Sequence, residues 1–209
     1  CRLYDPTEGF ITLNGIDIRK YNRTAFYRLF SAVFQQFSIL PVTIAEIVSE
    51  TTPENIDYDK MKRCLTVAGL WNKIEQLTNG VDSQFGKTIY DDGVEFSGGE
   101  IHKLFLARAM YKNAPVMLLD EPTAALDPIA ESTLYGNYNQ ISFQKTTVFV
   151  SHRLASTSFC DRIILIENGK ICEEGSHNEL LKQNGTYRML FETQAKYYKN
   201  NLGKTEVAE

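Results

Sequence analysis

Two acidic residues, Asp120 and Glu121, directly follow the apolar run Val116–Leu119. A short apolar run of this kind predicts a buried strand. A carboxylate pair at the end of such a strand is costly unless a cation or a reacting water uses it. The pair therefore indicates a centre that binds a metal ion and activates water. An ordinary strand that ends in two solvated acidic residues would give the same sequence pattern.

A second feature is the run Ser97-Gly98-Gly99-Glu100, which opens an amphipathic segment. Two glycines at a helix start leave backbone N–H groups accessible, and the helix dipole adds positive potential there. Both effects favour a bound phosphate. Taken alone, Ser97-x-x-Glu100 is also the pattern of a capping box, in which the two side chains only cap the helix.

Together, in this order and spacing, these stretches resemble the ATP-binding domain of ABC transporters. FSGGE stands where that family has its LSGGQ signature, VMLLDEP corresponds to its Walker B strand, and AALDP to its D-loop. The segments YDPTEG, SHRLAST and EEGSHNELL resemble the exporter type. A chance match of signature, Walker B and D-loop together is very unlikely.

The resemblance implies a role for each residue of an ATP-hydrolysing centre. Glu121 would polarise the attacking water, and Asp120 would hold Mg²⁺ through its water shell. Gln35, after a strand at residues 31–34, would complete the contacts to the metal and the water. His152, after a buried strand at residues 146–150, would bond the γ-phosphate. Without this context, Gln35 reads as a surface residue and His152 as a structural one.

The resemblance also implies a second copy of the domain. In a head-to-tail dimer, Ser97, Gly98 and Gly99, with Glu100 at the same helix start, would bind the γ-phosphate of the ATP held by the other copy. Asp127 in the D-loop would link the two sites. An ionised carboxylate close to a γ-phosphate is unfavourable, so we expect Glu100 to point away as the capping partner of Ser97.

The sequence departs from the family pattern in the signature and in the phosphate loop. Phe96 and Glu100 replace the usual Leu and Gln, and the Walker A loop is expected before residue 1. The stretch Gly80–Thr88 comes close to a phosphate-binding loop but has one residue too many between its glycines. It also lacks a preceding apolar strand and a following helix, so we interpret it as a turn. We therefore expect these 209 residues alone not to bind or hydrolyse ATP.

The expected fold is α/β: a P-loop NTPase-like (RecA-like) core sheet, N-terminally incomplete, with an inserted helical subdomain. We assign residues 1–40 and 112–175 to the core, 41–111 to the helical subdomain, and 176–209 to C-terminal helices and a tail. The tail from Asn200 is polar, and we expect it to be disordered. Residues 1–9 read as the last turn of a helix that runs into a Pro/Gly turn. Asn14-Gly15 predicts a turn, and Asn168-Gly169 predicts a hairpin. Strands are expected at residues 10–13, 31–34, 116–119, 146–150, 162–167 and 170–174. Helices are expected at residues 22–30, with Asn22 as the cap, and at 45–49, 58–68, 70–76, from Ser97 to about Tyr111, at 129–138, from 175, and at 186–199.

Composition limits the partners and the compartment. The net charge of −4 argues against a nucleic-acid partner, and four cysteines without paired spacing suit a reducing cytosol. No apolar run reaches the roughly 20 residues that span a bilayer. The resemblance to ABC exporters implies a domain at the cytoplasmic face of the plasma (inner) membrane, attached through a transmembrane domain that these residues do not contain.

The functional hypothesis is the ATP-binding and ATP-hydrolysing domain of an ABC exporter, in which ATP-driven dimerisation is coupled to export. One alternative is a non-catalytic, truncated interaction module that binds a partner domain without turnover. The other is a chromosome-maintenance ATPase of the SMC type. The short stretch between Gln35 and Ser97 argues against it, because such proteins insert a long coiled coil there.

Overall fold

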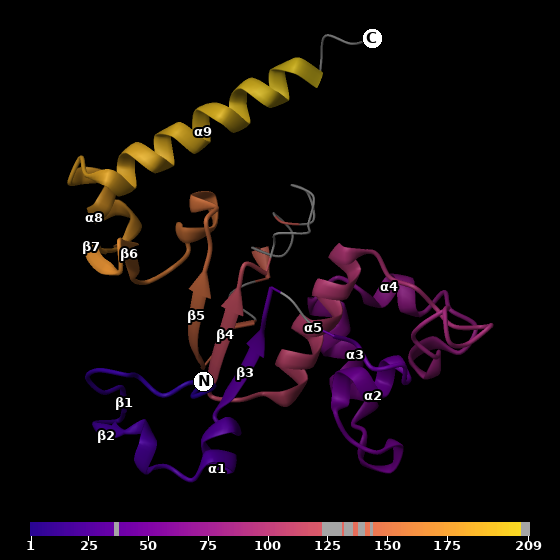
Figure 1. Cartoon of the computed structure of the whole chain (residues 1–209). Coiled ribbons are helices and arrows are strands. Elements are labelled where there is room, and N and C mark those ends of the chain that lie inside the picture. The colour runs from indigo at the N-terminus through magenta and orange to yellow at the C-terminus, as the bar shows by residue number, and fades with distance from the viewer. Residues whose placement is uncertain (36–37, 123–130, 132–135, 138–140, 143, 206–209) are drawn as a thin grey trace. The chain divides into compact units, whose positions relative to one another are not determined.

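The computed structural model describes residues 1–205 except 36–37, 123–130, 132–135, 138–140 and 143 (Figure 1). Two compact units make up the chain, Cys1–Val150 and Ser151–Glu209. The first holds a parallel sheet and most helices, and the second a hairpin and two helices. The mixed α/β composition with a parallel sheet confirms the predicted fold class, whereas the predicted domain boundaries stay a prediction.

The first unit begins with a small antiparallel hairpin. It pairs β1 (Thr12–Leu13) with β2 (Ile16–Asp17) across the predicted Asn14-Gly15 turn. Both turn residues have positive φ, 51° and 77°, as the favoured two-residue hairpin turn requires. The 3₁₀ helix η1 (Ile18–Lys20) leads on to α1 (Arg23–Tyr27). The Asn22 side chain caps α1 by accepting a hydrogen bond from the Ala25 N–H (3.1 Å).

The predicted helical turn at the start of residues 1–9 is wrong, because these residues form bends and no helix. The bend expected after Pro6 is present, with Gly9 at a φ of +72°. Arg2 has a φ of +60°, outside the right-handed helical region. The proline at position 6 lacks an N–H to donate to a helical hydrogen bond.

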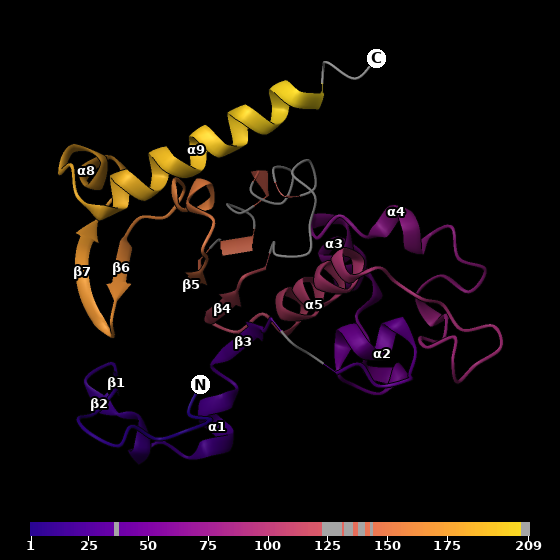
Figure 2. The ribbon, with the colours of Figure 1, turned by 45° about the horizontal axis from the view of Figure 1, so that its top comes forward.

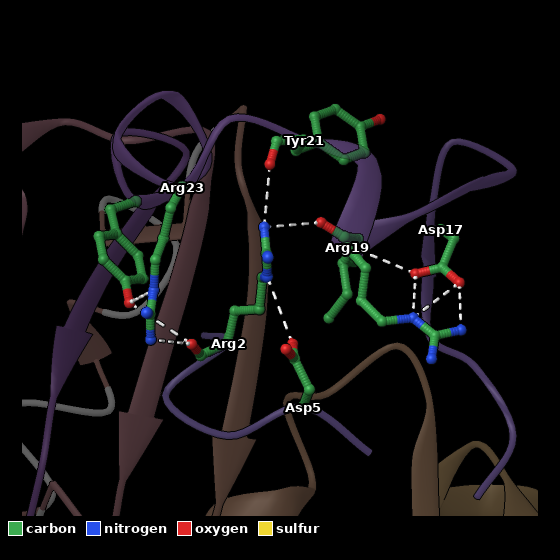
Figure 3. Close-up of polar contacts among 8 residues, drawn as sticks. Arg2, Asp5, Asp17, Arg19, Tyr21 and Arg23 are labelled. Carbon is green, nitrogen blue, oxygen red and sulfur yellow. Dashed lines mark hydrogen bonds and ion pairs between the residues drawn. The ribbon is translucent and has the colours of Figure 1, made fainter. Parts of the chain in front are cut away.

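The N-terminal segment is instead fixed by Arg2 (Figure 3). Its guanidinium donates to the carbonyl oxygens of Ile18 (3.1 Å) and Tyr21 (2.9 Å), and it pairs with Asp5 at 3.3 Å. A planar cation that bonds two carbonyls at once ties the segment to the turn before α1.

The central sheet is parallel, with the order β3 (Phe30–Val33), β4 (Val116–Asp120) and β5 (Thr146–Val150) (Figure 1). Its register places Val33, Leu119 and Phe149 side by side. These side chains join the main hydrophobic core, and α5 packs close to β3. One face of the sheet is therefore covered by the helices of this unit.

The prediction that β5 is a buried strand is wrong. Val148 is 47% exposed and Val150 54% exposed. Among the described residues, β5 pairs only with β4 and lies at the edge of the sheet. Its apolar residues predict burial from sequence alone, but burial depends on what covers the strand.

The helical block follows β3, as predicted, and ends in the helix that starts at the signature (Figures 1 and 2). Its elements are α2 (Ile44–Ser49), η2 (Pro53–Asn55), α3 (Tyr58–Val67), α4 (Trp71–Ile74), η3 (Gly80–Asp82) and α5 (Gly98–Lys112). α5 packs against both α2 and α3. Its fully buried residues, Leu104 and Ala107 among them, anchor it in the main core. The signature thus stands at the end of a firmly packed helix.

The second unit contains η4 (Leu154–Thr157), the hairpin β6 (Ile163–Glu167) and β7 (Lys170–Gly175), α8 (His177–Lys182) and α9 (Thr186–Thr205). The predicted Asn168-Gly169 turn joins the two strands. Figure 2 shows the hairpin leading through α8 into the start of α9. Tyr187 is fully buried there, and its hydroxyl lies 2.6 Å from Thr157 Oγ1 and 2.7 Å from His177 Nδ1.

The last helix extends further than predicted. α9 continues to Thr205, whereas the sequence predicts its end at Lys199 and a disordered tail. The added residues contain a glycine but no proline, so nothing forbids their helical hydrogen bonds. No helix in the described parts of the chain is long and apolar enough to cross a membrane. Most of the helix predicted at residues 129–138 lies outside the described residues.

Candidate functional site

The first candidate site lies at the carboxyl ends of β3 and β4. The two strands are parallel neighbours, with Val33 opposite Leu119. Asp120 is the last residue of β4, and Gln35 follows the end of β3 by two residues. Carboxyl ends of parallel strands share one edge of a sheet, where ligands bind in open α/β folds. The topology therefore brings these predicted residues to one edge.

The Gln35 and Glu121 side chains are in direct contact. Gln35 Nε2 donates a hydrogen bond to Glu121 Oε2 at 3.2 Å, although 86 positions separate the two residues. This contact unites two residues that the sequence assigned to one centre. Because the amide donates to the carboxylate, Gln35 fixes one oxygen of Glu121 in a defined position.

The backbone at Glu121 is also specialised. Its φ is +47°, in the left-handed region that few residues other than glycine adopt. Its N–H donates to the carbonyl of Val150 at 2.9 Å, which links it to the end of β5. The chain thus turns sharply after Asp120, and Glu121 no longer follows the alternation of side chains between the two faces of the sheet. Residues held in such conformations often belong to functional sites. No motif in the sequence predicts this backbone conformation.

The acidic pair suits a magnesium ion on the chemistry of its donors. Mg²⁺ is usually held by one or two carboxylates together with phosphate oxygens of the substrate and water. Asp120 and Glu121 supply two carboxylates, and the Gln35 amide oxygen is a further oxygen donor. Within the described ranges, no group of three His, Cys, Asp or Glu side chains lies close enough together to hold a metal ion by itself. The donor set fits a metal shared with a nucleotide.

His152 belongs to the second unit. It follows β5 by two residues and has an exposed side chain. Its carbonyl oxygen accepts a hydrogen bond from Gln194 Nε2 (2.7 Å), and the Gln194 Oε1 accepts from the N–H of Leu154 (2.9 Å). Gln194 therefore fixes the backbone on both sides of Arg153. That His152 joins Glu121 at a nucleotide stays a prediction.

The second candidate site is the start of α5. Ser97 is its N-cap, and its hydroxyl accepts a long hydrogen bond from the Glu100 N–H (3.4 Å). Glu100 Oε2 in return accepts from the Ser97 N–H at 2.7 Å. The capping box that the sequence allows is thus present. The N–H groups of Gly98 and Gly99 have no carbonyl to donate to within the helix, so they are the groups available to an anion.

Glu100 makes a further contact that the sequence does not reveal. Lys73 Nζ, from α4, lies 2.7 Å from its Oε1 and 2.8 Å from its Oε2. Burial by itself raises the pKa of the Glu100 carboxyl, but the hydrogen bonds from Lys73 and Ser97 outweigh it and the net pKa is lowered. The carboxylate is ionised at neutral pH, and the ammonium group of Lys73 balances its negative charge. No periodicity or motif links Lys73 to the signature, so sequence reasoning missed it.

Two other predictions concern loops. Asp127, assigned to the D-loop, lies outside the described residues. The stretch Gly80–Thr88 begins with η3 and continues as isolated bridges and a turn, and its Lys87 is exposed. It has no strand before it and no helix after it, which confirms its interpretation as a turn.

Comparison with known proteins agrees with this geometry. Residues 1–124 match the family described as ABC transporter, which covers the strand-end site and the signature. The chain belongs to the ABC transporter family. Its family is thus the one that the motifs predicted.

Relatives of this ABC transporter chain include ATP-dependent lipid A-core flippases. The flippase of Paraburkholderia xenovorans is 36% identical over 92% of this chain and 31% of its own length. That of Cupriavidus metallidurans is 35% identical over 93% of this chain and 33% of its own length. The chain thus spans about a third of the curated relatives it matches.

A solved structure extends the similarity to three dimensions. A bacterial Atm1-family ABC exporter with ATP bound superposes with a TM-score of 0.83 at 29% identity. The match covers 93% of this chain and 33% of that one. The fold is therefore that of an ABC exporter's ATP-binding domain, a P-loop NTPase fold.

Proposed function

We propose that this chain is the ATP-hydrolysing domain of an ABC exporter and drives export of a substrate across a membrane. The observation that carries the proposal is the contact between Gln35 and Glu121 beside Asp120, at the carboxyl ends of two parallel strands. ATP hydrolysis needs a group that orients an in-line water and a metal that neutralises the β- and γ-phosphates. Residues of these types meet at this edge.

Each side chain has a separate task in the proposed reaction. Glu121 accepts the hydrogen bond of the attacking water and raises its nucleophilicity. Gln35 keeps Glu121 in place through the 3.2 Å hydrogen bond and presents its amide oxygen to the metal or the water. Asp120 holds the hydrated metal, and His152 donates to the γ-phosphate. When bound, Mg²⁺ supplies the positive charge that stabilises the phosphate oxygens.

The start of α5 serves the ATP bound to a second ABC domain. Ser97, Gly98 and Gly99 offer a hydroxyl and backbone N–H groups to the γ-phosphate, and the helix dipole favours the anion. Glu100 takes part as the capping residue of the same helix start. Asp127 links the two sites. The arrangement is a head-to-tail dimer with ATP between the two copies.

The exporter assignment includes a membrane partner. The matched relatives are about three times as long as this chain, and their names describe flippases. We propose that the full-length protein carries a transmembrane domain and that this domain works at the cytoplasmic face of the plasma (inner) membrane. Nucleic acid is not a partner.

The test is Mg²⁺-dependent phosphate release by the full-length protein in membranes or detergent. We expect turnover of at least about one per second, the low end for typical enzymes, and its loss when EDTA removes the metal. A full-length protein that binds a partner ABC domain but releases no phosphate would contradict the proposal and identify the non-catalytic module instead.

The dimer is tested with a heterodimer in which one copy carries Ser97→Arg. The bulky side chain should block the phosphate from the N–H groups of Gly98 and Gly99 and impair the ATP site whose Walker A loop is on the unmodified copy. Failure of the modified copy's own site, with the other intact, would refute the trans assignment.

A further inference from the structure

The carboxylate of Glu100 stands at the helix start where the proposed phosphate binds. It is a first-turn residue of α5, and one of its oxygens accepts from the Ser97 N–H at 2.7 Å. An ionised carboxylate and a phosphate are both attracted to a helix N-terminus and repel each other. An unpaired Glu100 would therefore oppose binding of the γ-phosphate at Ser97, Gly98 and Gly99.

Lys73 is placed to remove this conflict. Its Nζ bonds both oxygens of Glu100, at 2.7 and 2.8 Å, and lies 5.2 Å from the centre of the Phe96 ring. The aromatic ring holds the ammonium group beside the signature by a cation–π contact. Lys73 comes from α4, whose Ile74 is fully buried in the main core. The ammonium group of Lys73 is therefore held by a helix that is packed into the core.

We propose that Lys73 is a positioning residue for the signature: it holds the Glu100 carboxylate back against the Ser97 N–H and neutralises it, so that the helix start accepts the γ-phosphate of a second domain's ATP. The role rests on the proposed function and adds to it the residue that makes an acidic signature compatible with an anionic ligand. Lys73 acts through Glu100 and does not contact the nucleotide.

The test is a double-mutant cycle on steady-state ATP hydrolysis by the full-length protein. Lys73→Met leaves the Glu100 charge unpaired and should raise the KM for ATP roughly three- to tenfold, with little change in kcat, the size expected for one partly screened charge. Glu100→Gln keeps a capping side chain without the charge. In that background, Lys73→Met should no longer change the KM.

Salt and a matched lysine separate electrostatics from structure. Because the repulsion is screened, the KM difference should shrink as ionic strength rises from about 0.05 to 0.5 M. The control is Lys62→Met, since the Lys62 ammonium also rests on an aromatic ring, Trp71, at 4.9 Å. Lys62 lies outside the proposed site, so its loss should leave the KM unchanged. Far-UV circular dichroism and thermal unfolding of each variant report whether the fold is intact.

The outcomes are distinct. An unchanged KM in Lys73→Met, in a protein that hydrolyses ATP, would overturn this role and leave the proposed function standing. A KM that stays raised in the double variant would also overturn it, because Lys73 would then act on the nucleotide or the fold directly. A wild-type protein without Mg²⁺-dependent hydrolysis would overturn the proposed function and this role together.

Discussion

Leu104 is the residue through which the stability of the signature helix is best measured. It lies in α5 with 0% of its surface exposed, within the core shared with α2 and α3. Leu104→Ala removes three carbon atoms. At about 0.8 kcal/mol for each buried carbon this costs about 2.4 kcal/mol. The cavity left behind adds about 1 kcal/mol, so the free energy of unfolding should fall by about 3.4 kcal/mol.

The assay is urea unfolding followed by fluorescence of Trp71. It is the single tryptophan of the chain and packs against the same core, so it reports on the unit that contains α5. With a typical dependence of a few kcal/mol per molar urea, the midpoint should fall by on the order of 1 M. The dilute protein that fluorescence requires also limits association through exposed apolar surface.

Leu40→Ala is the matched control. It deletes the same three carbon atoms from a side chain that is 72% exposed. A surface change of this kind alters stability by less than about 0.5 kcal/mol. Equal destabilisation by the two substitutions would refute the conclusion that α5 is anchored through its buried face.

Further predictions concern a buried hydroxyl, a crowded glycine and the acidic signature. Tyr111→Phe removes the hydroxyl that accepts from a backbone N–H at the start of α3 (2.9 Å), and should cost about 1 kcal/mol in the same urea assay. Gly93→Ala should destabilise by about 1–3 kcal/mol, because its new carbon would lie 2.8 Å from a backbone oxygen. Gly136→Ala, with nothing within 4 Å of the added carbon, should not. The Glu100 carboxyl has a pKa below its ordinary 4.5 in the folded state. Its contribution is therefore present above about pH 4.5 and is lost as the pH falls through the folded value. The stability advantage of wild type over Glu100→Gln, measured by urea unfolding from pH 7 to pH 3, should shrink accordingly.

Local signals predicted the parts of the fold that local interactions determine. The Asn22 cap and the hairpin turn at Asn168-Gly169 depend only on neighbours in the chain, and both occur as expected. The exposure of Val148 was missed because it depends on which elements cover the sheet, information that no window of sequence contains.

The candidate site divides in the same way. Ser97 as a helix cap follows from its pattern with Glu100, and the acidic pair after an apolar run pointed to Glu121. The bond from Gln35 to Glu121 could be expected only through the family resemblance. The role of Lys73 was missed because its ion pair joins it to Glu100, a residue 27 positions away in another helix. Such contacts are set by packing rather than by spacing along the chain.

The central claim is that Glu121 activates the water that hydrolyses ATP. It is tested most directly by steady-state phosphate release from the full-length protein carrying Glu121→Gln, beside ATP binding by the same variant. The control is Glu54→Gln, a change at an exposed acidic residue in η2, far from Glu121 in the sequence. The account predicts a rate at least about 100-fold below wild type, with ATP still bound and the Glu54 variant unaffected. A Glu121→Gln rate within about twofold of wild type would contradict it, since a general base contributes about 10²-fold or more.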